Sequence, residues 1–137
     1  MLSSQEIISK VGISFGPCTV SISQADVEEF AKAVGADLSL GIPATFLTRL
    51  RDGEFKLLDR AGIKLQTVLH AEQEYEFKRP LKIGMQLSYG GSLAKAFEKA
   101  HLVFLIFETH YFEGESQDPS QLVVTSRTTM VLRRTSG

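Results

Sequence analysis

The sequence predicts an α+β domain in which an antiparallel sheet wraps around a central helix. After one short strand, apolar residues at helical spacing and helix-stopping glycines occur in the first half of the chain. Alternating or β-branched segments then fill the second half. Helices followed by a run of strands are typical of α+β domains with an antiparallel sheet.

Length and composition indicate one globular domain spanning residues 1–137. The chain has 137 residues, of which 43% are hydrophobic and 23% charged, and its formal net charge is -1. A surface that binds nucleic acid or anionic lipid favours a basic excess, so this near-balance argues against both. The single Cys18 cannot form an internal disulfide, and no Cys/His pair has zinc-ligand spacing. We therefore expect no metal and no cofactor.

The first elements are a strand and a capped helix. Residues Gly16 to Ile22 read as a short strand, and Ser23 has the character of an N-cap. The helix that follows ends naturally at Gly35. Its apolar stripe, at positions i, i+3, i+4 and i+7, consists of Val27, Phe30, Ala31 and Val34.

A second, central helix is expected to begin at Pro43, a residue suited to a first helical turn. The pair Asp52-Gly53 is expected to interrupt it, and helix is expected to resume from Glu54 to Arg60. The apolar residues that could bury one side of its first part are Phe46, Leu47 and Leu50.

Four strands are expected after Gly62. The first, Thr67 to Arg79, alternates and ends at Pro80. Its polar face is expected to carry His70, Glu72, Glu74, Glu76 and Lys78, opposite Leu69, Ala71, Tyr75 and Phe77. The others are Met85 to Leu93, His101 to Phe112 and Gln121 to Arg134.

Several segments of this arrangement resemble the MaoC-like dehydratase N-terminal domain family, which has the hotdog fold. The segment LHAEQEYEFKRPLKIGMQL, from Leu69 to Leu87, resembles that family's second-strand signature. The segment GIPATFL resembles the start of its central helix, SQADVEEFAKAVGA its early helix and RTTMVLRR its last strand. The resemblance spans roughly Val11 to Arg134. It implies a dimer or pseudo-dimer of hotdogs that binds acyl-CoA or acyl-carrier-protein thioesters between two central helices.

The sequence departs from this family at its catalytic pair. The resemblance implies the following pattern for catalytic members. An aspartate and, five residues later, a histidine lie just before the central helix. Asp37 stands where the aspartate would, but Ile42 stands in place of the histidine. Isoleucine cannot exchange a proton, so the acid–base chemistry is not carried over.

The remaining site candidates each have two interpretations. Asp37 is either a residual catalytic position or a loop residue, and His70 is either a base or a structural histidine. Arg79 could approach a CoA phosphate or pair with a glutamate. The glutamates of the same strand could act as acid and base or form a solvated face. The segment expected to bind the thioester at the helix start consists of Gly41, Pro43, Ala44, Thr45 and Phe46.

Three functions remain open on the sequence alone. The first is a substrate-binding subunit of a 3-hydroxyacyl-thioester dehydratase or enoyl hydratase, paired with a catalytic hotdog subunit. The second is a self-sufficient hotdog thioesterase with Asp37 or Glu54 as its carboxylate, and the third is a non-enzymatic homodimer that binds acyl-CoA. The lack of a signal sequence or long apolar run predicts a cytoplasmic protein.

Overall fold

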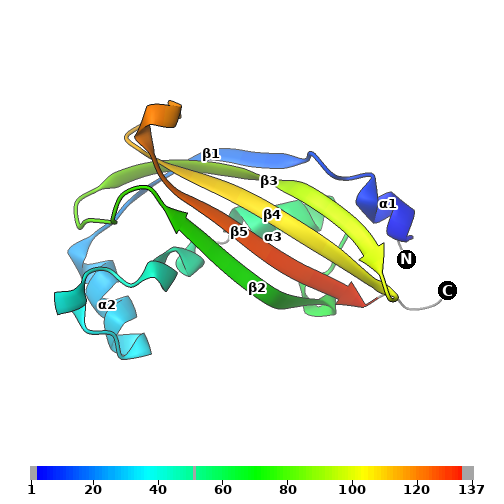
Figure 1. The fold of residues 1–137 in the computed structure, drawn as a ribbon, viewed down its shortest axis with the longest axis horizontal. Helices are drawn as coiled ribbons and strands as arrows, with labels where there is room; N and C mark the ends of the chain where they lie inside the picture. The colour runs from blue at the N-terminus through cyan, green and yellow to red at the C-terminus, as the bar shows by residue number, and fades with distance from the viewer. Residues whose placement is uncertain (1–2, 51, 134–137) are drawn as a thin grey trace.

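Five antiparallel strands form a single sheet in the computed structural model, which describes residues 3–50 and 52–133. Figure 1 shows the sheet as a long, curved layer with α3 (Asp52–Arg60) against one face. The strand order is β1-β3-β4-β5-β2, so β1 and β2 form the two edges. The strands are β1 (Ser14–Ser21), β2 (Val68–Phe77), β3 (Gln86–Lys99), β4 (Leu102–Glu113) and β5 (Leu122–Arg133). This confirms the predicted α+β class.

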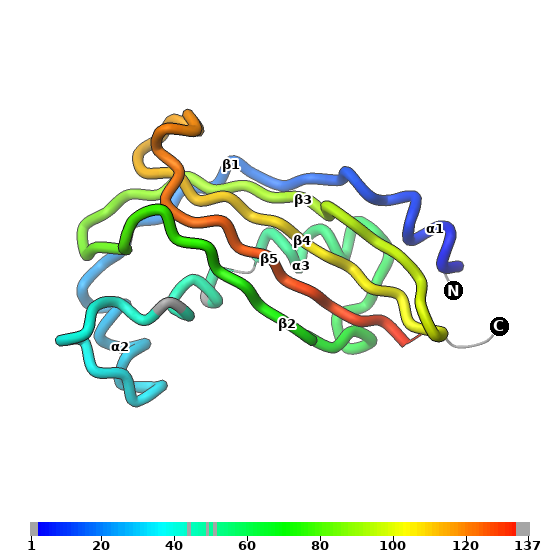
Figure 2. Tube along the Cα trace, viewed as in Figure 1, coloured from blue at the N-terminus to red at the C-terminus, as the bar shows by residue number. Residues whose placement is uncertain are grey.

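Local signals define the N-terminal helices. A short helix α1 (Ser4–Ile8), which the sequence did not predict, is capped by the Ser3 hydroxyl. Helix α2 (Gln24–Val34) begins as predicted after Ser23, whose hydroxyl accepts a bond of 3.1 Å from the backbone N–H of Asp26. It ends at Gly35, in the left-handed conformation that favours glycine. Figure 2 shows α1 and the end of β5 at the same end of the sheet.

The central helix differs from its prediction in position. Residues Ala44–Arg49 form a 3₁₀ helix, η2, and α3 (Asp52–Arg60) follows it. The expected interruption at Asp52-Gly53 is wrong, because α3 starts there. A side chain on Gly53 would collide with the ring of Phe15, so glycine lets the helix approach β1 closely. The remaining 3₁₀ turns are η1 (Leu38–Leu40), η3 (Leu65–Thr67) and η4 (Pro119–Gln121).

Two clusters of buried apolar residues lie on the inner face of the sheet, the first beneath α3 and the second beside α2 and η2. Leu57 and Leu58 of α3 pack into the first, together with Leu93, Leu105, Phe107 and Met130 from three strands. The second cluster includes Val27 of α2 and both Phe46 and Leu47 of η2. The ring of Phe46 meets that of Phe30 edge-on, with ring centroids 5.6 Å apart. The sheet is thus wrapped around its helices as expected.

A bulge in β2 changes which side chains face inward. The register shifts between His70 and Glu72 as β2 pairs with β5, leaving Ala71 as the extra residue. His70 lies opposite the buried Met130, and therefore on the inner face. The prediction that His70 shares a face with Glu72 is wrong for this reason. Strand β3 also runs six residues beyond its predicted end at Leu93, to Lys99.

Candidate functional site

The loop before the central helix holds Asp37 in a local turn. One carboxylate oxygen of Asp37 accepts a bond of 2.9 Å from the backbone N–H of Ser39. Hydrogen bonds from the hydroxyl and the backbone N–H of Ser39 hold the pKa of this exposed carboxyl below its usual value. Ile42, five residues on, packs half-buried against the second apolar cluster. Neither side chain is arranged to deliver a proton at neutral pH.

The predicted thioester-binding segment surrounds the start of η2. Gly41 has φ of 103° and ψ of -178°, a conformation in which residues with a side chain are strained. Pro43 is half-buried and Thr45 exposed, whereas Phe46 is buried in the core. The backbone at Ala44 belongs to η2, but its side chain lies outside the described part of the structure.

Gln73 links His70 to β5 on the inner face. The side-chain nitrogen of Gln73 donates to the hydroxyl of Ser126, at 2.7 Å, and to the carbonyl of Arg127, at 3.3 Å. Its oxygen lies 2.8 Å from the hydroxyl of Thr128 and 3.2 Å from Nε2 of His70. Because Ser126 and Thr128 are buried, this amide satisfies polar groups that would otherwise be costly.

The same contacts define the proton position on His70. The carbonyl of Arg127 can only accept, so it fixes which end of the Gln73 amide is the nitrogen. The amide oxygen must then accept, and Nε2 of His70 must donate to it. A neutral His70 therefore carries its proton on Nε2, and Nδ1 is left as an acceptor on an exposed side chain.

Arg79, after the end of β2, makes three contacts in the structure. Its Nη1 lies 2.7 Å from Oε1 of Glu113, on β4. Its Nη2 donates to the carbonyl of Ser120, at 3.1 Å, and to the side-chain oxygen of Gln121, at 3.4 Å. Of the two predicted interpretations, the pairing with a glutamate is the one present here.

Glu54, the carboxylate considered above for a thioesterase, lies buried between α3 and the sheet, near tyrosines that the sequence did not single out. Glu54 is 4% exposed in the first turn of α3, and Tyr111 of β4 is 3% exposed. Burial, and next the negative charge of Glu54, raise the pKa of the Tyr111 hydroxyl far above its usual value. The ring of Tyr89 stacks on Tyr111, with centroids 5.1 Å apart. Glu54 begins an i, i+3, i+4, i+7 stripe with Leu57, Leu58 and Ala61, and this inward position was a readable signal.

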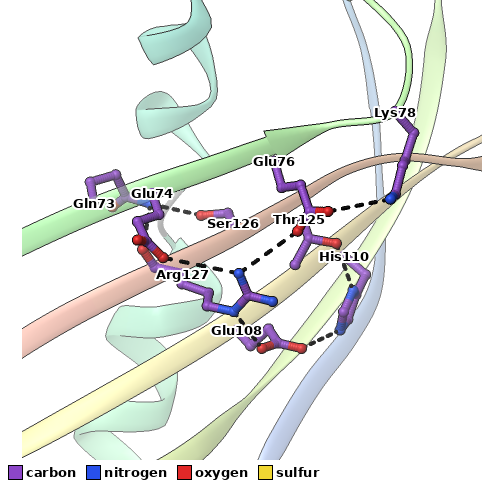
Figure 3. Close-up of polar contacts among 9 residues, drawn as sticks. All are labelled: Gln73, Glu74, Glu76, Lys78, Glu108, His110, Thr125, Ser126 and Arg127. Atoms are coloured by element: carbon purple, nitrogen blue, oxygen red, sulfur yellow. Dashed lines mark hydrogen bonds and ion pairs between the residues drawn. The ribbon is translucent and has the colours of Figure 1, made fainter.

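The outer face of the sheet carries a separate charged cluster, shown in Figure 3. Arg127 donates from Nε to Oε2 of Glu108, at 3.0 Å. The other oxygen of Glu108 lies 3.0 Å from Nε2 of His110, whose Nδ1 lies 3.3 Å from the hydroxyl of Thr125. The cluster is separated by the sheet from the inner-face residues described above.

A family model described as FAS1-like, dehydratase domain region, matches residues 9–117. Comparison with curated proteins gave no match. No helix within the described residues is long and apolar enough to cross a membrane.

Several solved structures share this fold at low sequence identity. One is a chain of the HadBC (3R-hydroxyacyl-ACP dehydratase) complex from Mycobacterium tuberculosis, with a TM-score of 0.73 and 19% identity over 89% of this chain and 96% of that one. A MaoC-like dehydratase has a TM-score of 0.77 and 20% identity, over 93% of this chain but only 43% of that one. The (R)-hydratase from A. caviae involved in PHA biosynthesis has a TM-score of 0.60 and 16% identity, over 88% and 94%.

These likenesses confirm the hotdog fold expected from the sequence. They are below the identity at which a shared activity could be inferred. The family model, in contrast, covers most of the chain. The chain therefore belongs to the family of FAS1-like dehydratase domains.

Proposed function

We propose that this chain is the substrate-binding subunit of a hotdog 3-hydroxyacyl-thioester dehydratase or enoyl-thioester hydratase, and that a catalytic hotdog partner supplies the acid–base pair. The observation that carries this proposal is the state of the loop from Asp37 to Ile42. The carboxylate of Asp37 is held in a turn by the backbone N–H of Ser39. Ile42, five residues later, has an apolar side chain that packs against the second cluster.

This loop matters because the reaction requires groups that transfer protons. Dehydration removes a proton from the carbon next to the thioester carbonyl and protonates the departing 3-hydroxyl group. Both transfers need a group that titrates near neutral pH and reaches the substrate. Ile42 has no such group, and the lowered pKa of Asp37 keeps that residue ionised and unable to act as an acid near pH 7.

On this proposal the chain supplies binding surface rather than acid–base groups. The backbone at Gly41 and the side chains of Pro43, Thr45 and Phe46 would form the wall beside the thioester. Nδ1 of His70 would accept a hydrogen bond from a substrate hydroxyl or a water on the inner face. Arg79 is the member of the predicted set with the weakest support, because its guanidinium is already bound to Glu113.

The partner is expected to be a related hotdog chain that carries the acid–base pair, because a second copy of this chain would lack that pair as well. The HadBC structure, as its name states, is a complex, which supports a paired arrangement for this fold. Under this proposal the ligand is a thioester of CoA or of an acyl-carrier protein, and the cytoplasmic location stays a prediction.

The first test is to assay the purified chain alone with crotonyl-CoA and octenoyl-CoA, following loss of the conjugated thioester absorbance. We expect no turnover, together with measurable binding of octenoyl-CoA by calorimetry. Asp37→Asn is the control variant, since this residue is exposed and the loss of its charge should leave binding unchanged. Turnover that disappears in His70→Ala or Asp37→Asn would contradict the proposal.

A self-sufficient thioesterase is the second candidate, and one observation favours it. Glu54 is a buried carboxylate at the start of the central helix, close enough to Tyr111 for its charge to affect that hydroxyl. Such a carboxylate could activate a water for attack on a thioester. Release of free CoA from octanoyl-CoA, abolished by Glu54→Gln in a folded protein, would select this candidate.

A further inference from the structure

The open edge of the sheet carries a row of carboxylates on its outer face. The side chains of Glu72, Glu74 and Glu76 in β2 are exposed, and their register opposite Thr129, Arg127 and Thr125 places them on one side of the strand. Figure 3 shows Glu74 and Glu76 beside Arg127. The acidic row is defined as these three glutamates.

Nearby cations neutralise only part of this acidic row. Nε of Arg127 lies 3.0 Å from Oε2 of Glu108. Its Nη1 lies 4.0 Å from Oε2 of Glu74 and 3.9 Å from Oε2 of Glu76. Lys78 lies 3.3 Å from Glu76. Arg127 thus pairs with Glu108 as well as with two members of the row, so among the described residues the outer surface of β2 keeps a negative excess.

β2 is the edge at which a partner strand can add. The other edge strand, β1, is interrupted, since its register with β3 shifts between Phe15 and Cys18. Pro17, inside that irregular stretch, has no N–H to offer a neighbour. β2 presents a ten-residue edge in which the single irregularity lies near its start, at Ala71. An edge of this length needs a cover, or it becomes a site of uncontrolled pairing.

A second copy of this chain fits that edge poorly. Two identical antiparallel strands related by a two-fold axis place outer-face residues opposite outer-face residues. When the two β2 strands are centred on each other, glutamates of one copy face glutamates of the other. Directly opposed like charges destabilise a strand pair.

We propose that the acidic row of β2 disfavours pairing with a second copy and selects a hotdog-type partner whose matching edge strand carries Lys or Arg at alternate outer-face positions. This inference rests on the proposed function, which requires a catalytic partner, and it adds the charge by which that partner is recognised. Complementary charge across the seam speeds association and suppresses the wrong pairing.

The test uses a charge-reversed copy of this chain as the partner. We would prepare the triple variant Glu72→Lys, Glu74→Lys, Glu76→Lys, and measure association of the wild type alone, the variant alone and their mixture by sedimentation. We expect the mixture to associate at least ~10-fold more tightly than either protein alone at low salt. The difference should shrink at about 0.5 M salt, where charges are screened over a few ångströms.

A matched control distinguishes an effect of charge on β2 from an effect of net charge alone. A variant with Glu28→Lys, Glu29→Lys and Glu115→Lys makes the same change in net charge away from β2 and should give no tighter mixture. If the β2 lysine variant does not fold, the triple glutamine variant replaces it and should self-associate more strongly than the wild type.

Two results would overturn the proposal: a mixture no tighter than the separate proteins, or wild-type self-association that neither salt nor the glutamine variant changes. The sedimentation readout contains no substrate. Turnover by the chain alone would refute the proposed function without altering this result, so the two failures are distinguishable.

Discussion

The ring of Phe15, on β1, occupies the space that a side chain at Gly53 of α3 would need. This contact joins the central helix to an edge strand through a residue with no side chain of its own. Replacing Gly53 by alanine should favour the helix by about 1 kcal/mol on intrinsic propensity alone. The collision with Phe15 should outweigh this gain and give a net loss of roughly 1–3 kcal/mol.

Urea unfolding of Gly53→Ala measures the sign of this change. Adding Phe15→Leu should recover part of the lost stability, since a smaller side chain leaves room for the new methyl group. A Gly53→Ala protein more stable than the wild type would show that helix propensity, and not the contact with Phe15, dominates at this position.

The contacts of Gln73 predict the tautomer of His70. Side-chain ¹⁵N NMR should find the proton of neutral His70 on Nε2, because the oxygen of Gln73 accepts from that atom. Gln73→Leu should mix the two tautomers and lower stability by about 1–3 kcal/mol, since the buried Thr128 hydroxyl loses its partner. His101 provides an internal reference in the same spectra, and a proton on Nδ1 of His70 in the wild type would contradict the assignment.

The buried Tyr111 predicts a loss of stability at alkaline pH. Its pKa in the folded protein is raised above the ordinary 10.0, so the unfolded chain releases this proton first as the pH rises. The stabilising contribution is complete below about pH 10 and is lost above it, by roughly 1.4 kcal/mol at pH 11. Tyr111→Phe should show a correspondingly smaller fall in urea midpoint between pH 8 and pH 11, while equal falls in both proteins would rule this out.

Arg79 should contribute more to stability than to ligand binding. Its ion pair with Glu113 is partly exposed, so we expect Arg79→Ala to cost about 1 kcal/mol or less. A double-mutant cycle with Glu113→Gln should recover a coupling of similar size. Affinity for octenoyl-CoA should stay within about twofold, and a loss seen with octenoyl-CoA but absent with octenoyl-pantetheine would instead assign Arg79 to a CoA phosphate.

The parts of the fold that were predicted correctly depend on local signals. The cap at Ser23 and the stop at Gly35 act within a few residues, and α2 has the predicted limits. The start of α3 could not be predicted, because the place of Gly53 in the helix depends on Phe15, a residue distant in sequence. The last strand, expected from Gln121 to Arg134, is described as Leu122–Arg133, and Arg134 lies outside the described residues.

In the candidate site, too, features that depend on neighbouring residues could be predicted, and features that depend on distant residues could not. The replacement of histidine by Ile42 could be read directly, since it depends only on a resemblance at neighbouring positions. The side of the strand on which His70 lies could not be predicted, because the bulge at Ala71 reverses the alternation on which the prediction rested. The bond between Gln73 and Thr128 joins residues 55 positions apart, and it exists only in the register that β2 and β5 adopt.

The interruption of β1 at Gly16–Pro17 has a consequence for the size of any assembly. A chain whose sheet exposes two edge strands that can pair could add neighbours without limit and grow into a fibre. With β1 made irregular by this stretch, β2 is the more regular edge of the described sheet at which a neighbour can add, and strand addition there ends once that edge is paired. The irregular stretch in β1 therefore disfavours addition of a second neighbour and limits strand addition to a finite assembly.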